Sequence, residues 1–267
     1  MMPLSEWPMQ ARRAIRGVLT DIDDTLTTGG ELTPDVLTAL ARLRAARVRL
    51  IAVTGRPTYW ALPLLRLCRF DAVIAENGAS AFWLDGEGRQ QSLFYADIST
   101  RREHRRRLDA FALTLQARFP QVPVADDAPQ RVADLAFDIG ENMPRLASDQ
   151  VDEITSFMRA HGFFATASSI HAHASLAAFS KQAMSARILD EVFGTDDASA
   201  RQQFVFVGDS GNDASMFAHY PNAIGVANIA PFLGGLPVPP AYVTRLACGA
   251  GFVEVVNAIL EARDEEK

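Results

Sequence analysis

Short apolar runs alternate with amphipathic stretches along the first part of the chain. Residues 17–22, 49–53 and 72–75 are apolar runs of strand length, and each leads into polar residues. After the first run, Thr33-Pro34 has the pattern of a helix N-cap followed by a first-turn proline, and apolar positions at helical spacing follow it. A second helical stretch covers residues 58–68. Strands that alternate with helices predict a parallel sheet with helices on both faces.

The middle of the chain has a different pattern. It combines two helical stretches with several short strand-like runs, at residues 101–119, 149–161, 134–139, 163–167 and 170–175. The strand–helix alternation returns after it, with a helix that begins near Lys181, strands at residues 204–207 and 223–226, and a final helix from residue 252. We predict an α/β fold with a Rossmann-like parallel sheet, interrupted by a small α+β insertion. The predicted core comprises residues 1–81 and 177–267, and the insertion comprises residues 82–176.

Acidic residues gather where two of the apolar runs end. The first run leads into Asp21-Ile22-Asp23-Asp24-Thr25, and the run at 204–207 leads into Gly208-Asp209-Ser210-Gly211-Asn212-Asp213. Carboxylates packed this closely repel one another unless a cation or a proton neutralises them. Ligands of parallel sheets bind beyond the carboxyl ends of the strands, and Mg²⁺ prefers oxygen ligands. We predict one Mg²⁺ site that involves Asp21, Asp23, Asp209 and Asp213.

The same residues, with two others, suit phosphoryl transfer. Asp21 is a candidate nucleophile, because carboxylates form aspartyl-phosphate intermediates. Asp23 points the same way as Asp21 in an extended chain, and it would protonate the leaving alcohol and then activate water. Thr54, at the end of the second strand, would donate its hydroxyl and a backbone N–H to phosphate oxygens. Lys181 would neutralise the negative charge of nucleophile and phosphate.

Composition narrows the class of protein. Hydrophobic residues make up 48% of the chain, which is enough for a substantial core, and the formal net charge of −6 argues against a nucleic-acid binder. Cys68 and Cys248 are too few and too far apart for a disulfide scaffold or a cysteine-based zinc site. No apolar run reaches membrane-spanning length, and the first residues lack a signal-peptide core. We expect a cytoplasmic monomer or dimer without membrane or nucleic-acid partners.

The motifs, taken in order, resemble those of one enzyme family. D-I-D-D-T at residues 21–25, Thr54, Lys181 and G-D-S-G-N-D at residues 208–213 resemble the motifs of the haloacid dehalogenase-like phosphohydrolases. Residues 75–79 and 134–141 are similar to the branch that contains sucrose-phosphate, trehalose-phosphate and mannosyl-phosphoglycerate phosphatases. The resemblance covers essentially the whole chain. It implies that Asp21 is the nucleophile and Asp23 the acid/base. It also implies that the metal is held by Asp21, Asp209 and the backbone carbonyl of Asp23.

Spacing and one departure refine this resemblance. The stretch from Thr25 to Thr54 has room for one helix, whereas the stretch from Thr54 to Lys181 has room for a strand and a full cap domain. That placement resembles the branch with an α/β cap after the second motif, so the insertion is expected to be the cap. Asp23 argues against a dehalogenase, whose first motif lacks this second aspartate. Asp24 stands where many relatives have glycine, and alternation predicts that its side chain points away from Asp21 and Asp23.

Residues at the strand ends and on the insertion are expected to contact the substrate. They are Thr54, Gly55, Arg56, Asn77, His171, His173 and Asn212. The chain is predicted to be a Mg²⁺-dependent phosphatase for a small phosphorylated metabolite, with a sugar phosphate favoured. Two alternatives stay open: a phosphomutase of the same superfamily, which would release no inorganic phosphate, and a non-catalytic metabolite-binding protein.

Overall fold

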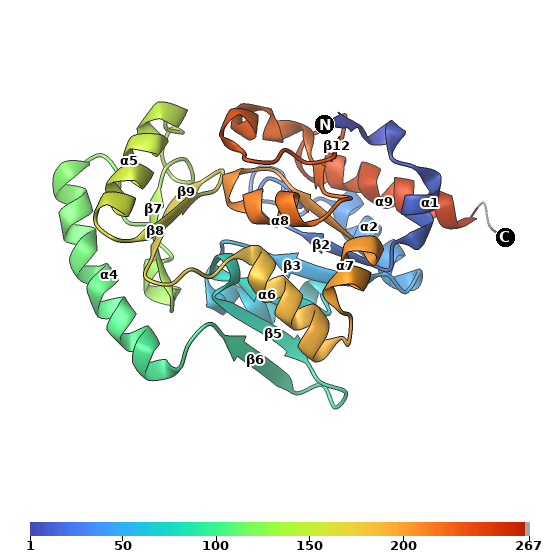
Figure 1. Ribbon diagram of the computed structural model, residues 1–267, viewed down its shortest axis with the longest axis horizontal. Coiled ribbons are helices and arrows are strands. Elements are labelled where there is room, and N and C mark those ends of the chain that lie inside the picture. Colours follow the sequence, from blue (N-terminus) through green and yellow to red (C-terminus); the bar gives the residue numbers. More distant parts are fainter. Residues whose placement is uncertain (265–267) are drawn as a thin grey trace.

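The computed structural model describes residues 1–264 and has a large and a small sheet (Figure 1). The strand order of the large sheet is β1-β12-β11-β10-β2-β3-β4-β5-β6, and that of the small sheet is β7-β9-β8. No helix in residues 1–264 is both long and apolar enough to cross a membrane.

The large sheet is parallel over most of its width. Its parallel strands are β1 (Met2–Pro3), β12 (Tyr242–Val243), β11 (Ile224–Gly225), β10 (Phe204–Gly208), β2 (Gly17–Thr20), β3 (Arg49–Val53) and β4 (Ala72–Ala75). Successive side chains of the central strands enter opposite hydrophobic clusters: Val18 packs into one and Leu19 into the other. Both faces of the sheet are therefore buried, which accounts for the continuous apolar runs in the sequence.

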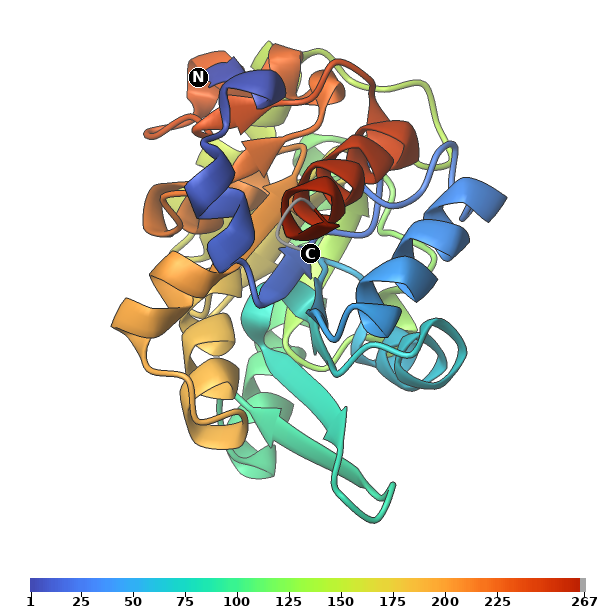
Figure 2. The ribbon, with the colours of Figure 1, turned by 90° about the vertical axis from the view of Figure 1, so that its right-hand side faces the viewer.

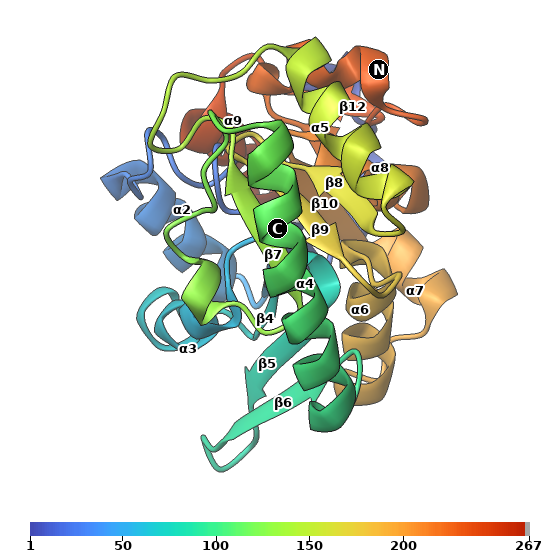
Figure 3. The same cartoon turned by 90° about the vertical axis from the view of Figure 1, so that its left-hand side faces the viewer.

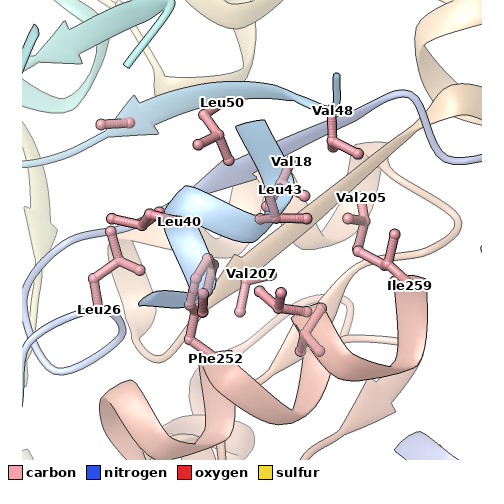
Figure 4. Close-up of a cluster of buried hydrophobic side chains, with 14 of the residues drawn as sticks. Val18, Leu26, Leu40, Leu43, Val48, Leu50, Val205, Val207, Phe252 and Ile259 are labelled. Carbon is pink, nitrogen blue, oxygen red and sulfur yellow. The ribbon is translucent and has the colours of Figure 1, made fainter. Parts of the chain in front are cut away.

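Helices cover both faces of this sheet, as Figure 2 shows from the side of α9. One face is covered by α1 (Met9–Ala14), α2 (Pro34–Ala45), α3 (Ala61–Pro63) and α9 (Cys248–Asp264). In the cluster beneath α2 and α9, Leu40 and Leu43 face Val18, Val207 and Phe252 (Figure 4). The other face is covered by α6 (Lys181–Arg187), α7 (Asp197–Gln203) and α8 (Ala214–His219). The predicted fold class, an α/β sheet with helices on both faces, is confirmed.

Among residues 1–264, helices pack against one face of the small sheet only. Its antiparallel strands are β7 (Asp134–Asp138), β8 (Phe164–Ala167) and β9 (His171–Ser175), and α4 (Ile98–Arg118) and α5 (Ser148–Ala160) pack against it (Figure 3). Alternation separates the side chains of β9: Ala172 and Ala174 enter the cluster beneath the helices. His171 and His173 therefore lie on the opposite face, toward the large sheet.

Two strands at the start of the predicted insertion, the first of which begins before residue 82, extend the large sheet instead. β5 (Ser80–Leu84) pairs antiparallel with β4, and β6 (Gln90–Phe94) pairs with β5. The tight connection from β4 to β5 has positive φ at Glu76, Asn77 and Gly78. This turn reverses the chain immediately after β4, so residues 82–94 return along the edge of the large sheet.

Candidate active site

The predicted acidic residues meet at the carboxyl ends of two neighbouring strands. β2 and β10 lie side by side, so Asp21 and Asp209, the first residues after them, are close in space, and Asp21 N donates to the Val207 carbonyl at 2.9 Å. Asp213 follows in the turn before α8. Carboxylate oxygens of Asp21, Asp209 and Asp213 all lie within 4.8 Å of one another, and the three residues are buried.

Polar neighbours fix two of these carboxylates. Asp209 accepts from Thr25 Oγ1 at 3.3 Å and from Asn228 Nδ2 at 3.2 Å. Asp213 accepts from the backbone N–H of Asp209 and of Ser210, at 3.0 and 3.2 Å. These bonds hold the carboxylates in place despite their mutual repulsion.

Lys181 is the one cation in direct contact with this group among the described residues. It begins α6, its side chain is fully buried, and Nζ donates to Asp21 Oδ1 at 2.6 Å and to Asp213 Oδ1 at 2.7 Å. Burial opposes its charge, but the two carboxylates raise the pKa of Lys181 above its usual value, so it stays protonated. Lys181, which was predicted to neutralise the nucleophile, is thus in contact with Asp21 and Asp213.

The residues fit a divalent cation at this point. Three buried carboxylates face one ammonium group, which leaves excess negative charge. Burial, opposed by Lys181 and reinforced by Asp213 and Asp23, raises the pKa of Asp21 to about 8. Burial, together with the charges of Asp21 and Asp213, also raises the pKa of Asp209. The raised pKa values reflect excess negative charge at this point, and a bound Mg²⁺ would neutralise that charge.

Asp23 has a different partner. Arg56 donates to both of its carboxylate oxygens, with Nε at 3.0 Å from each and Nη2 at 2.8 Å from Oδ1. Arg56 Nη1 lies 2.7 Å from Glu141, and Glu141 Oε2 lies 2.7 Å from His171 Nε2. The hydrogen bond with His171, aided by Arg56, lowers the pKa of Glu141 to about 2. A chain of polar contacts therefore runs from Asp23, beside the large sheet, to His171 on the small one.

This placement changes part of the predicted metal set. The Asp23 carboxylate was predicted among the metal ligands, but it lies outside the group of three carboxylates and is bonded to Arg56. That the backbone carbonyl of Asp23 binds the metal stays a prediction. β2 ends at Thr20 and a turn begins at Asp23, so Asp21 and Asp23 follow the strand and do not belong to it. Both nevertheless line the same cavity of about 10 Å³.

Asp24 occupies a strained backbone position in that turn. Its φ of 54° lies in the left-handed region, which glycine adopts most easily and which aspartate tolerates better than most residues. Its backbone N–H donates to Thr27 Oγ1 at 3.1 Å, and its carbonyl accepts from Asn228 Nδ2 at 2.9 Å. The turn conformation thus gives a physical reason for glycine at this position in relatives.

The remaining predicted contacts surround the small cavity. It is lined by Asp21, Asp23, Gly55, Arg56, His171, His173 and Asn212, together with residues 168–170 of the loop before β9. A cavity of this size has room for about one water molecule. Thr54, at the end of β3, is buried, and its hydroxyl accepts from Arg56 N at 3.0 Å. The two sheets are therefore closed over the acidic group.

His173 and Asn77 lie on either side of the boundary between the two sheets. His173 Nδ1 is 2.9 Å from Asp134 Oδ2, and Arg131 Nη1 donates both to Asp134 Oδ1 and to the Gly55 carbonyl, at 2.9 Å each. Asn77 Oδ1 accepts from Asn212 Nδ2 at 3.0 Å. The structure thus brings the predicted substrate contacts of both sheets together.

Four residues at the site were not predicted for the roles they have. Glu76, considered only as part of a turn or a substrate contact, accepts backbone N–H groups of Thr58, Val132 and Ala133 at 2.8–3.0 Å. Arg131, Glu141 and Asn228 complete the contacts described above. Glu141 ends the stretch that carried the family resemblance, whereas Asn228 lies just before a Pro- and Gly-rich loop that looked like an ordinary surface connection. The contacts that bring them to the site, such as that of Arg131 with the Gly55 carbonyl, join residues distant in sequence, so no local pattern pointed to these roles.

Comparison with known protein families agrees with the motifs. Residues 18–104 match the family model of haloacid dehalogenase-like hydrolases. The match confirms the resemblance that the motifs indicated, and it supports the prediction that the chain is a hydrolase. A comparison with curated protein sequences gives no significant match.

Solved structures share the fold over almost the whole chain. The sucrose-phosphatase of Synechocystis sp. PCC6803, solved with sucrose and phosphate, is 16% identical, with a TM-score of 0.62 over 92% of this chain and 98% of its own. A sugar phosphatase of HAD subclass IIB is 16% identical, with a TM-score of 0.64 over 92% of this chain and 98% of its own. A haloacid dehalogenase-like hydrolase from Bacteroides thetaiotaomicron is also 16% identical, with a TM-score of 0.62 over 92% and 99%. At this identity the similarity establishes the fold.

Proposed function

We propose that the chain is a Mg²⁺-dependent phosphatase that hydrolyses a small phosphorylated metabolite, with a sugar phosphate as the favoured class. The observation that supports this most is the buried group of three carboxylates with Lys181 bonded to Asp21. The fold shared with sugar phosphatases favours the same class of reaction.

Two aspartates carry out the two steps of the proposed reaction. A carboxylate oxygen of Asp21 attacks phosphorus and forms an aspartyl phosphate, while the bond from phosphorus to the leaving oxygen breaks. Asp23, in its protonated form, gives that oxygen its proton, and the alcohol leaves. The Asp23 carboxylate then takes a proton from water, the water oxygen attacks phosphorus, and the bond to Asp21 breaks to release phosphate. In the structure Arg56 donates to both oxygens of the Asp23 carboxylate, so the oxygen that carries the proton would leave Arg56 and face the leaving group, while the other oxygen stays bonded to Arg56.

Positive charge is the main requirement of this reaction. A phosphate dianion approaches a carboxylate only where nearby cations offset the repulsion. Lys181 supplies one of these charges through its contact with Asp21. Asp21, Asp209 and Asp213 would hold Mg²⁺, which would supply the other when bound.

The small sheet with α4 and α5 would act as the cap. The cavity of about 10 Å³ is too small for a phosphorylated metabolite, so substrate entry requires the two sheets to separate. Closure would then exclude water and bring His171 and His173 to the leaving group. We assign this cap to the segment after β6 within the predicted insertion of residues 82–176.

Hydrolysis of p-nitrophenyl phosphate by purified protein tests the proposal. We expect nitrophenol and free phosphate to appear with Mg²⁺, to stop with EDTA, and to return when Mg²⁺ is restored. Activity that persists in EDTA would contradict the metal assignment, and transfer of the phosphoryl group without free phosphate would favour a phosphomutase. A complete lack of turnover over a panel of phosphorylated metabolites would favour a binding protein.

A further inference from the structure

One guanidinium group contacts both the large sheet's Asp23 and the cap. Arg56 follows β3, and its Nε and Nη2 donate to the Asp23 carboxylate. Its third nitrogen, Nη1, lies 2.7 Å from Oε1 of Glu141, which follows β7 of the small sheet. Among residues 1–264, Asp23 and Glu141 are the two carboxylates that pair with Arg56. Arg56 therefore joins the proposed acid/base residue to the cap.

Glu141 is fixed by other residues of the cap. The buried Asp138 accepts from the backbone N–H groups of Gly140 and Glu141 through Oδ1 and from that of Asn142 through Oδ2, each at 2.8 Å. The other carboxylate oxygen of Glu141, Oε2, lies 2.7 Å from His171 Nε2 on β9. The Glu141 carboxylate thus has a defined position relative to the small sheet, and it moves with the cap.

Arg56 depends on Glu141 for part of its orientation. In the large-sheet unit the guanidinium contacts the Asp23 carboxylate and lies over the half-exposed ring of Trp60, with Cζ 5.2 Å from the ring centroid. Substrate entry separates the two sheets, and Nη1 then loses its ion-pair partner. An arginine side chain has many rotamers, so the loss of one of two fixed partners widens the range of orientations that Arg56 adopts.

Closure of the cap restores a directional contact. In the closed arrangement the side chains of Asp23, Arg56 and Glu141 are only 16%, 15% and 24% exposed. Hydrogen bonds between charged groups with little solvent around them are short and have a specific geometry. Asp23 and Arg56 line the same cavity as the nucleophile Asp21, so the orientation of Arg56 bears directly on the reacting groups.

We propose that Glu141 is a positioning residue for the acid/base step, and that it orients the Asp23 carboxyl group through Arg56 only when the cap is closed. This inference rests on the proposed phosphatase function and adds a link between cap closure and proton transfer. The proton passes from Asp23 to the leaving oxygen as the bond from phosphorus to that oxygen breaks, and Glu141 neither gains nor loses a proton. Proton transfer is thereby slowed until the substrate is enclosed.

Two phosphate esters that differ in their leaving group test the proposal. Phenyl phosphate and p-nitrophenyl phosphate share a ring, but phenolate is the poorer leaving group and depends more on a proton from Asp23. The ratio kcat/KM covers only the steps through formation of the aspartyl phosphate, in which Asp23 acts as the acid. With Mg²⁺ present, we expect Glu141→Ala to lower kcat/KM about tenfold to a hundredfold for phenyl phosphate, and less than about threefold for p-nitrophenyl phosphate.

A double-substitution cycle tests whether Glu141 acts through Arg56. Arg56→Ala is expected to lower kcat/KM for phenyl phosphate at least as much as Glu141→Ala does. Adding Glu141→Ala to Arg56→Ala should then cost less than about a further twofold, because the two residues act as one unit. Glu141→Gln keeps an oxygen that accepts from Arg56, so it should recover part of the loss seen in Glu141→Ala.

Glu153→Ala is the matched control. Glu153 of α5 pairs with Arg118 of α4, so this ion pair joins two helices of the cap and does not reach the large sheet. The relative kcat/KM of the two esters should stay within about twofold of that of the unmodified chain. Circular dichroism checks the fold of every variant, and Glu141→Leu, which also lacks an acceptor, replaces Glu141→Ala if that variant does not fold.

Three results would overturn the inference. Equal losses for the two esters would give Glu141 a structural role, and unchanged values for both would give it no role in the reaction. Losses that multiply fully in the double variant would show that Glu141 acts independently of Arg56. The proposed function is tested separately, because it fails if the unmodified chain hydrolyses neither ester, whereas hydrolysis of both esters with no selective loss in Glu141→Ala refutes this inference alone.

Discussion

Glu76 provides the most demanding test of how the two sheets are held together. It follows β4 of the large sheet, is fully buried, and its carboxylate accepts from Thr58 N at 3.0 Å, Val132 N at 3.0 Å and Ala133 N at 2.8 Å. The last two N–H groups lie in the loop that enters β7. Glu76 therefore links the small sheet to the large one. One of its donors, Ala133, directly precedes Asp134, whose carboxylate contacts His173.

Replacing Glu76 by Gln keeps the shape of the side chain but changes one carboxylate oxygen, an acceptor, into an amide NH₂ group, a donor. One of the three N–H groups then faces an amide NH₂, so one charge-assisted hydrogen bond worth about 1.5–3 kcal/mol is lost and a buried donor is left unpaired. Burial and the nearby charge of Asp134 raise the pKa of Glu76, so removing its charge also relieves some repulsion. We expect a net loss of about 2–4 kcal/mol in the free energy of unfolding.

Urea-induced unfolding monitored by circular dichroism measures this loss. Glu103→Gln, which changes an exposed glutamate of α4 paired with Arg106, is the matched control and is expected to shift stability by less than about 0.5 kcal/mol. If Glu76→Gln also cost less than about 1 kcal/mol, the hydrogen bonds to this carboxylate would not hold the sheets together, and the reasoning would be refuted.

Three further predictions concern the charged groups of the site. Lys181→Met removes the positive charge that faces Asp21 and Asp213. In EDTA this substitution should lower the free energy of unfolding, measured with urea, by about 3–5 kcal/mol. An unchanged urea midpoint would show that the two ion pairs do not contribute to stability. Arg56→Lys replaces the bidentate partner of Asp23 by a single ammonium group. The kcat for p-nitrophenyl phosphate should then fall about tenfold to a hundredfold, because Asp23 loses its fixed orientation. An unchanged kcat would show that Arg56 has no part in the acid/base step. The pKa of Asp21 rises from 3.8 to about 8 on folding, so in the metal-free fold this group binds its proton more tightly than in the unfolded chain. The stabilisation contributed by Asp21 is therefore fully present below about pH 4 and is lost as pH rises toward about 8, and Mg²⁺ should reverse the loss. If the difference in thermal midpoint between the unmodified chain and Asp21→Asn in EDTA did not change over this range, the prediction would be contradicted.

The core was predictable because its strands are buried on both faces. β3 (Arg49–Val53) and β4 (Ala72–Ala75) have the predicted bounds, and Thr33 caps α2 as expected, accepting from Val36 N. The stretch at 58–68 was predicted as one helix, but Pro63 lacks a backbone N–H, and the structure has a 3-10 turn, one α-helical turn and a π-helical turn instead. The antiparallel strands β5 and β6 were missed because β6 is largely half-exposed and lacks a continuous apolar run.

The site was predictable as far as it depends on strand ends. Asp21 and Asp209 follow neighbouring parallel strands, so their proximity follows from the strand order. The partner of Asp23 did not follow, because Arg56 is 33 residues away in the sequence and no local pattern links the two. Contacts between the sheets, such as Arg131 with the Gly55 carbonyl, depend on how the cap packs, which residue spacing leaves open.

Isolation of a phosphorylated Asp21 tests the central claim most directly. Protein mixed with p-nitrophenyl phosphate and Mg²⁺, quenched in acid within one turnover and digested, is analysed by mass spectrometry. The account predicts that the peptide containing Asp21 gains the mass of one phosphoryl group, and that Asp21→Asn neither gains it nor releases phosphate. Steady phosphate release by Asp21→Asn, or a phosphoryl group on any other residue, would contradict the account.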